Sequence, residues 1–255
     1  MRYFVHLAYN GTNFRGWQRQ KETSITIQES IEFHLSKMLK QPIKVAGCGR
    51  TDAGVHASQY FLHFDYDLDF NFDPVIRINL MLPEDIRVFE FIPVHDKAHT
   101  QYDATQRTYT FHLHWNHNPF IAQTSLYIKN DNLDFSAMQE AVTYISRQTD
   151  FKSMCKKPNQ YKTTLCHLSE FVLIENETNM VFRISANRFL QSMVRLIVAR
   201  VLDVGQGRLT LAQLKSQFVS GRPPQFPTTA YPQGLYLAKV KYPYLDRANG
   251  LEHSK

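Results

Sequence analysis

The sequence predicts an α+β protein with two domains, and three observations support this fold class. The chain has 255 residues, which is too long for one small domain. Hydrophobic residues make up 43% of it, so a sizeable core can be buried. Segments with the two-residue period of strands alternate with segments that have the spacing of amphipathic helices. We place one domain at residues 1–100 and the other at residues 101–255.

The first domain is expected to have the element order β-α-β-β-α-β, which is the ferredoxin-like, RRM-like arrangement with a largely antiparallel sheet. Aromatic and β-branched residues predict a buried strand at 2–9. Thr26 and Glu29 form a capping-box pattern ahead of apolar residues at helical spacing, and that helix ends before Pro42. The remaining predicted elements are strands at 43–46, 59–66 and 86–94 and a short helix within 71–82.

The second domain mixes the same kinds of element. Alternation predicts a half-buried strand at 107–115. An apolar stripe predicts a helix at 190–204, with Arg188, Gln191 and Arg195 on its polar side. The other predicted elements are a strand at 120–128 paired with 107–115, helices at 134–148 and 209–219, a hairpin of 166–174 with 179–185, and a closing strand at 235–240.

The charge balance is moderately basic, with 29 basic and 23 acidic residues and a net charge of +6. This fits a polyanionic partner but does not identify one. Several of the 18 Phe and 13 Tyr stand beside Arg or Lys, as on surfaces that bind unstacked bases, although most of these rings are expected in the core. Two interpretations are open for a set of basic residues: they contact phosphates, or they only favour solubility. These residues are Arg15, Arg19, Lys21, Lys156, Lys157 and Lys162.

The cellular compartment is expected to be the cytoplasm. Cys48, Cys155 and Cys166 are odd in number and form no C-x-x-C pair, which indicates reduced thiols. The first residues read as a strand and not as a signal peptide. No apolar run reaches a membrane-spanning length, so we expect no membrane association.

Residues 49–57, Gly-Arg-Thr-Asp-Ala-Gly-Val-His-Ala, form the most informative segment of the chain. Gly47, Gly49 and Gly54 permit a tight turn that presents the carboxylate of Asp52 at a loop tip. The nearby Arg50 favours the ionised carboxylate, which suits a nucleophile or a base. The alternative is an ordinary polar turn after a strand.

Two further residues have chemistry that fits a site with Asp52. Tyr109 shares a strand face with Arg107 and Phe111 by the period of two, and it either stacks on a base or belongs to an ordinary strand face. Arg195 either pairs with a carboxylate in a cleft or is simply solvated.

Other chemistries lack their motifs. His112, His114 and His117 have no carboxylate or cysteine nearby to complete a metal site, and we expect that strand to lie at the surface without a metal. The glycine-rich loop lacks the phosphate-loop spacing, and no G-x-S-x-G motif is present.

Five segments together resemble the TruA-type tRNA pseudouridine synthases. They are the opening segment 9–20, the Asp52 segment 49–57, Arg107-Thr108-Tyr109, the F-L-x-x-M-V-R pattern at 189–195, and Gly234-Leu235-Tyr236-Leu237. The five occur in order over nearly the whole chain. Residues 228–234 and 151–164 depart from the family pattern, so the details of one active-site loop and of some tRNA contacts are open.

The resemblance implies an isomerase that converts uridine to pseudouridine in the anticodon stem-loop of tRNA, at positions 38, 39 and 40. It implies two α+β domains whose sheets join across a basic active-site cleft, a homodimer, and no cofactor. Asp52 would start glycosidic cleavage, either by attacking the sugar or by removing its 2′ proton.

By the same motif positions, Arg195 would pair with Asp52, Tyr109 would stack on the uracil, Arg50 would help extrude the base, and Leu235 would contact the substrate. The sequence leaves two alternatives. One is a non-catalytic tRNA-binding protein or chaperone on the same scaffold, and the other is a metal-dependent hydrolase that uses the histidines.

Overall fold

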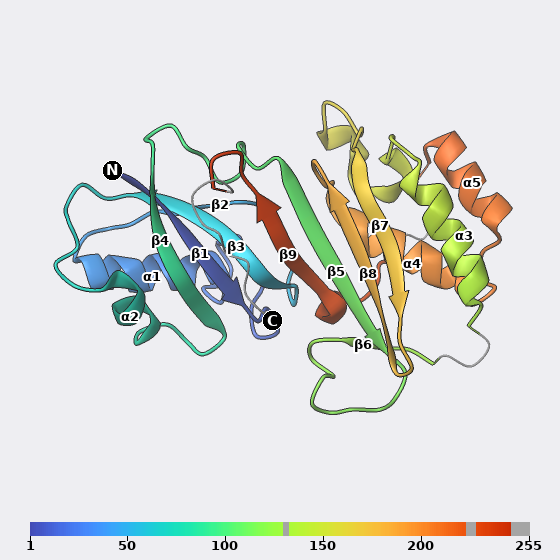
Figure 1. Cartoon of the computed structure of the whole chain (residues 1–255), viewed down its shortest axis with the longest axis horizontal. Helices are drawn as coiled ribbons and strands as arrows, with labels where there is room; N and C mark the ends of the chain where they lie inside the picture. Colours follow the sequence, from blue (N-terminus) through green and yellow to red (C-terminus); the bar gives the residue numbers. More distant parts are fainter. Residues whose placement is uncertain (130–132, 223–227, 246–255) are drawn as a thin grey trace. The chain divides into compact units, whose positions relative to one another are not determined.

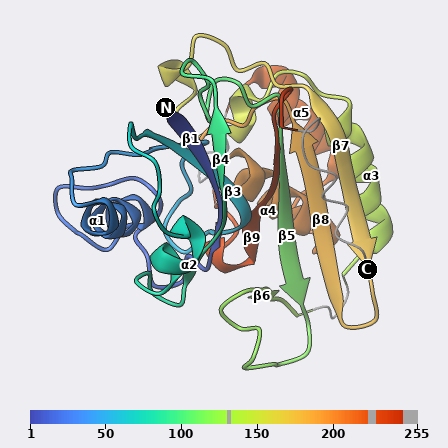
Figure 2. The same cartoon turned by 60° about the vertical axis from the view of Figure 1, so that its left-hand side comes forward.

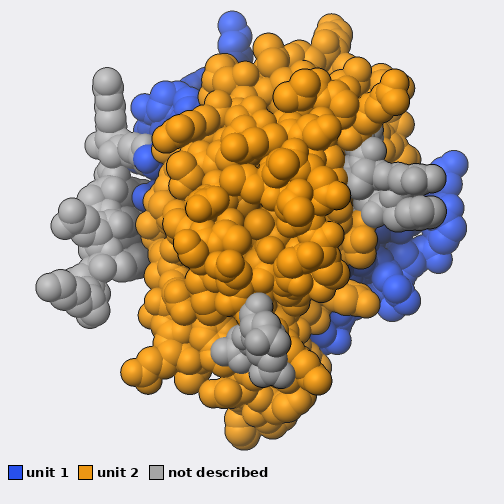
Figure 3. Space-filling model, turned by 90° about the vertical axis from the view of Figure 1, so that its right-hand side faces the viewer, with its two compact units in different colours: residues 1–107, 236–255 blue, residues 108–235 orange. Residues whose placement is uncertain are grey.

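A computed structural model describes residues 1–129, 133–222 and 228–245. These residues form two compact units, which Figure 3 shows in different colours. Unit 1 comprises residues 1–107 together with residues from 236 onward, and unit 2 comprises residues 108–235. Each unit is a mixed α+β structure. The division into domains 1–100 and 101–255 stays a prediction.

Unit 1 contains a sheet with the strand order β4-β1-β3-β9, and β2 pairs with Leu62 and His63 near the end of β3 (Figure 1). β1 is antiparallel to β3 and β4, whereas β9 runs parallel to β3, with Tyr236 opposite His56. The bounds are β1 Arg2–Tyr9, α1 Ile27–Leu39, β2 Ala46–Gly47, β3 His56–Asp65, α2 Pro74–Asn79, β4 Ile86–Val94 and β9 Leu235–Lys241.

Helices α1 and α2 cover one face of this sheet (Figure 2). The predicted N-cap of α1 is confirmed, since the Thr26 side chain accepts a hydrogen bond from the backbone of Glu29 at 3.3 Å. The predicted strand at 43–46 is wrong. The backbone N–H groups of Ile43 and Val45 donate to Ser36 and Glu32 of α1, so they are not available to a strand ladder, and β2 begins only at Ala46.

Unit 2 contains the strand order β5-β8-β7, and its helices lie on one face of this sheet (Figures 1 and 2). β7 and β8 form the predicted antiparallel hairpin. Among the described helices of the chain, none is long and apolar enough to cross a membrane. The bounds are β5 Gln106–His114, β6 Leu126–Tyr127, α3 Phe135–Ser146, β7 Leu168–Glu175, β8 Asn179–Ala186, α4 Met193–Gly205 and α5 Leu211–Ser220, with 3₁₀ turns at Lys152–Met154, Pro158–Gln160 and Pro232–Gly234.

Two predicted elements of unit 2 are shorter than expected. The strand predicted at 120–128 is reduced to Leu126–Tyr127, and it runs parallel to β5. The helix predicted from Leu190 begins at Met193, because Ser192 has a φ of 59° and a left-handed residue interrupts a right-handed helix. Arg188 and Gln191 therefore precede α4 and do not lie on its polar side.

Candidate active site

Asp52 lies in unit 1, on the loop that joins β2 to β3. The backbone N–H of Val55 donates to the carbonyl of Asp52 at 3.2 Å, which closes a tight turn. Gly54 in this turn has a φ of 75°, as the glycine pattern predicts. Asp52 is half-buried and Arg50 is exposed, while Thr51 between them is buried. The loop therefore keeps its central residue packed against unit 1 and directs the Arg50 side chain to solvent.

Three side chains form hydrogen bonds with residues 48–51, the part of this loop that precedes Asp52. The Tyr9 hydroxyl is hydrogen-bonded to the Thr51 hydroxyl at 2.8 Å, and the Tyr60 hydroxyl donates to the carbonyl of Gly49 at 2.5 Å. Arg107 donates from Nε and Nη2 to the carbonyl of Cys48, at 3.3 and 2.7 Å. The three side chains belong to strands β1, β3 and β5, so the loop is held by regular secondary structure.

Residues Gly16 and Trp17 of the opening segment also support this loop. The backbone of Trp17 donates to the carbonyl of Thr51 at 3.1 Å, and the Trp17 ring stacks on Tyr60 with centroids 4.1 Å apart. Gly16 has a φ of 93°, and a Cβ there would lie 2.7 Å from the carbonyl oxygen of Thr51 and 3.2 Å from the carbonyl carbon of Asp52. The Gly16-Trp17 pair of the opening motif is thus a support for the Asp52 peptide. The sequence motif showed the residues but not this role.

Tyr109 lies in unit 2 on β5 and is half-buried. Its ring packs edge-to-face on Phe189, with centroids 5.0 Å apart and planes at 85°. The neighbouring Thr108 hydroxyl is hydrogen-bonded to Ser185 at 2.8 Å, which fixes β5 to β8 at this point. The Tyr strand motif and the F-L-x-x-M-V-R motif therefore meet within one unit.

Arg195 is the third residue of α4, also in unit 2. Its Nε donates to the carbonyl of Ala230 at 2.7 Å, and its Nη2 donates to the Thr229 hydroxyl at 3.2 Å. The backbone of Ala230 donates in return to the carbonyl of Arg195 at 3.1 Å. The segment at 228–234, which departs from the family pattern, is thereby attached to Arg195 by its backbone.

Leu235 is the first residue of β9 and is buried. The preceding Gly234 packs against β5, where a Cβ would lie 2.6 Å from the carbonyl oxygen of His112. Residues 234 and 235 are thus placed by close backbone packing on the strand that carries Tyr109. The assignment of Leu235 to substrate binding stays a prediction.

The basic residues proposed for RNA binding differ in their surroundings. Arg15, Lys21, Lys156 and Lys157 are exposed. Arg19 is exposed as well, but its guanidinium also lies 2.8 Å from a carboxylate oxygen of the buried Glu32. The sequence does not indicate this ion pair, because the two residues are 13 positions apart in different segments.

The histidines of β5 have ordinary hydrogen-bond partners. His112 is bonded to Thr110 at 3.0 Å and His114 to Ser125 at 2.9 Å. The expectation that this strand lies at the surface is wrong for His114, which is buried, and burial lowers its pKa. Over residues 1–129, 133–222 and 228–245, no group of three or more His, Cys, Asp or Glu side chains could hold a metal ion.

The cysteines agree with the expectation of reduced thiols. Cys48, Cys155 and Cys166 are buried and form no disulfide. Burial raises the pKa of the Cys48 and Cys166 thiols to about 11, so neither is suited to act as a nucleophile near neutral pH.

Comparisons with known proteins give a consistent result. A family model described as tRNA pseudouridine synthase matches residues 141–243. The tRNA pseudouridine synthase A of Parabacteroides distasonis is 39% identical over 247 residues, covering 95% of this chain and 96% of the relative. That of Porphyromonas gingivalis is 36% identical, covering 95% and 97%, and tRNA pseudouridine synthase A 2 of Bacillus cereus is 32% identical, covering 94% and 99%.

Among solved structures, a CRISPR endoribonuclease Cse3 bound to a 19-nucleotide RNA aligns at a TM-score of 0.21 and 10% identity, covering 80% of this chain and 97% of that one. That likeness is too weak to support a conclusion. The sequence relatives, by contrast, match over almost the whole length of both chains. The chain belongs to the family of tRNA pseudouridine synthases.

Proposed function

We propose that this protein isomerises uridine to pseudouridine in tRNA, at positions 38, 39 and 40 of the anticodon stem-loop, with Asp52 as the catalytic nucleophile or base. The observation that carries the proposal is the construction of the Asp52 loop. Hydrogen bonds from Tyr60, Arg107 and Trp17 hold its carbonyl groups from separate elements. A catalytic carboxylate needs such preorganisation, whereas an ordinary turn does not.

The reaction fits the residues. The uracil detaches from C1′, rotates and rejoins through C5, so there is no net oxidation and no phosphate is consumed, and no cofactor is needed. A single carboxylate suffices to begin glycosidic cleavage. In this proposal Arg195 pairs with Asp52, Tyr109 stacks on the uracil, and Leu235 contacts it. The exposed Arg50 helps to extrude the base, a step that costs a few kcal/mol.

The proposal extends to the architecture and the setting. The family resemblance suggests two ferredoxin-like domains with a basic cleft, a homodimer that binds one tRNA across both subunits, and a cytoplasmic location. The element order β1-α1-β2-β3-α2-β4 in unit 1 supports the first of these. The expected partner is tRNA, without a membrane or a metal.

Tritium release from tRNA that contains [5-³H]uridine tests the function. Wild-type protein is expected to release tritium, and Asp52→Asn is expected to reduce the rate at least 1,000-fold, because an amide can act neither as nucleophile nor as base. Thermal unfolding of both proteins checks that the variant is folded. Equal rates would remove Asp52 from the mechanism. Binding of tRNA without release by wild-type protein would indicate a non-catalytic tRNA-binding protein.

A further inference from the structure

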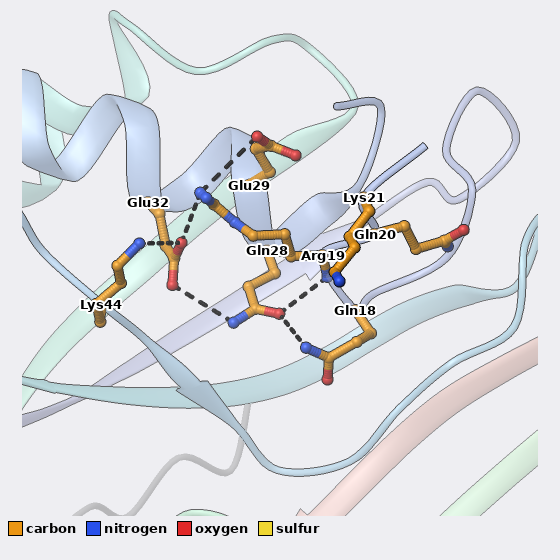
Figure 4. A pocket seen from close by; sticks show the side chains of 8 residues that line it. All are labelled: Gln18, Arg19, Gln20, Lys21, Gln28, Glu29, Glu32 and Lys44. Carbon is orange, nitrogen blue, oxygen red and sulfur yellow. Dashed lines mark hydrogen bonds and ion pairs between the residues drawn. The ribbon is translucent and has the colours of Figure 1, made fainter. Parts of the chain in front are cut away.

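A buried carboxylate lies beneath the opening segment, away from the Asp52 loop. Glu32 of α1 has only 4% of its surface exposed, and it lines a cavity of about 480 Å³ (Figure 4). Its Oε1 accepts from the backbone of Val45 at 3.1 Å. Its Oε2 lies 2.8 Å from Nη2 of Arg19 and 3.6 Å from Nζ of Lys44. Because a buried charge without a partner is costly, Glu32 requires a cation at this position.

Gln28, one turn earlier on α1, completes the connection to the opening segment. Its Oε1 accepts from the backbone of Arg19 at 3.0 Å and from the side chain of Gln18 at 2.9 Å. Its Nε2 donates toward Glu32 at 3.4 Å and to the carbonyl of Val45 at 3.2 Å. Figure 4 shows these side chains converging from the helix and the segment. Arg19 is therefore attached to α1 through both its backbone and its guanidinium.

The start of α1 attaches the residues next to Arg19 in the same way. The backbone N–H groups of Ile27 and Gln28 donate to the carbonyls of Gly16 and Trp17, at 3.2 and 3.0 Å. These helix-terminal donors have no partner within the helix, so the segment satisfies them. Gly16 and Trp17 are also the residues that contact the Asp52 peptide. A continuous series of contacts thus leads from Glu32 through Arg19 and the segment 16–19 to Asp52.

We propose that the Arg19–Glu32 ion pair positions Asp52 for the reaction, so that Arg19 is a positioning residue and not a contact for tRNA phosphate. The inference rests on the proposed function. Breaking the pair removes the side-chain anchor of the segment 16–19, so that only its hydrogen bonds to Ile27 and Gln28 remain, and this lets the Asp52 peptide move. Small displacements of a reacting group reduce turnover strongly, whereas loss of a phosphate contact weakens binding and its salt dependence.

The kinetic test separates kcat from KM for tRNA. We expect Arg19→Ala to lower kcat about 10- to 100-fold and to change KM less than twofold, with Arg19→Lys recovering part of kcat because it keeps a charge near Glu32. Lys37→Ala, at an exposed position of α1, removes the same charge and is the matched control with wild-type kcat. All rates are measured well below the unfolding temperature of each variant.

A second variant guards against misfolding from the charge of Glu32, which in Arg19→Ala keeps only Lys44, at 3.6 Å, as a cationic partner. Arg19→Gln combined with Glu32→Gln removes both charges, keeps the net charge, and retains an acceptor for Val45. This double variant is expected to be folded and to show the same reduced kcat as Arg19→Ala, since the two residues act as one unit. Wild-type kcat in the folded double variant, or a raised KM with unchanged kcat in Arg19→Ala, would overturn the proposal.

A spectroscopic measurement distinguishes failure of this inference from failure of the proposed function. Trp17 and Trp115 are the two tryptophans of the chain, so Trp115→Phe leaves Trp17 as the only reporter. In that background we expect Arg19→Ala to expose the buried Trp17 to quenching by acrylamide. If wild-type protein releases no tritium, the proposed function fails, and an unchanged quenching constant still overturns the structural link on its own.

Discussion

At the scale of single residues, the Asp52 loop depends on Gly16 as much as on its own glycines. Gly16 has a positive φ and lies against the peptide that joins Thr51 to Asp52. Both properties exclude a side chain. The sequence shows only a glycine before a tryptophan, more than 30 residues from the loop.

We therefore predict that Gly16→Ala lowers the free energy of unfolding by about 2–4 kcal/mol, from backbone strain and from the clash with the Thr51 carbonyl. It should also lower kcat, because the Asp52 peptide must shift. Gly207→Ala is the matched control, since Gly207 has a φ of 69° but nothing within 4 Å of a Cβ, and it should cost only about 1–2 kcal/mol. Urea denaturation measures both. Equal losses in the two variants would show that the contact contributes nothing.

At the scale of elements, a buried histidine joins β3 to the segment after β4. His63 of β3 is bonded through Nδ1 to the hydroxyl of Thr100 at 2.8 Å, and that hydroxyl donates to the carbonyl of Ala46 in β2 at 2.9 Å. Burial, together with the nearby His99 and Arg2, lowers the pKa of His63 to about 4. Burial therefore favours the neutral imidazole at this contact in the folded protein.

This arrangement predicts a pH-dependent stability. As pH falls below 6.5, unfolded His63 takes up a proton, whereas folded His63 stays neutral until about pH 4. The unfolded state is then favoured, so the free energy of unfolding should fall between pH 7 and pH 5, with His63 contributing about 2 kcal/mol of the loss. His63→Gln should reduce this dependence by that amount in urea titrations. His34→Gln, on α1, is the control, and an identical pH profile for His63→Gln would contradict the assignment.

The start of α4 is the second feature at this scale. The apolar stripe predicts a longer helix, but the left-handed Ser192 delays its start to Met193. Arg195 consequently lies in the first turn of α4, where its side chain and backbone bond to residues 229 and 230. Periodicity identifies which residues can share a helical face, but it does not reveal a single residue with positive φ.

At the scale of the whole molecule, the net charge of +6 fits a polyanionic partner. Lys156 and Lys157 are exposed beside a short 3₁₀ turn, and the backbone of Lys156 is bonded to the carbonyl of Gln191, just before α4. The two exposed lysines are thereby attached to the residues that precede the helix carrying Arg195.

Replacing both Lys156 and Lys157 by alanine should weaken tRNA binding and reduce the slope of log K against log salt by about 1–2. Filter binding at several salt concentrations measures this. Lys37→Ala with Lys97→Ala removes the same charge from exposed positions in unit 1 and is the control. An unchanged slope in the first pair would mean that these lysines do not contact phosphate.

The fold class, most of the elements and the family can be predicted from the sequence, because periodicity, capping residues and ordered motifs are local signals. Strands at 2–9 and 86–94 and the cap at Thr26 agree with the structure. The relatives confirm the family. The roles of Asp52, Tyr109 and Arg195 in one catalytic centre stay predictions.

The support of the Asp52 loop, in contrast, is visible only in three dimensions. Three contacts each join residues from different segments of the chain: the parallel pairing of β9 with β3, the contact of Gly16 with Asp52, and the ion pair of Arg19 with Glu32. Such contacts form when buried groups find their partners across elements, and a charge or a glycine in a motif does not reveal which partner that is. The sequence thus specified which residues are available for the chemistry, and packing in three dimensions specified what holds them in place.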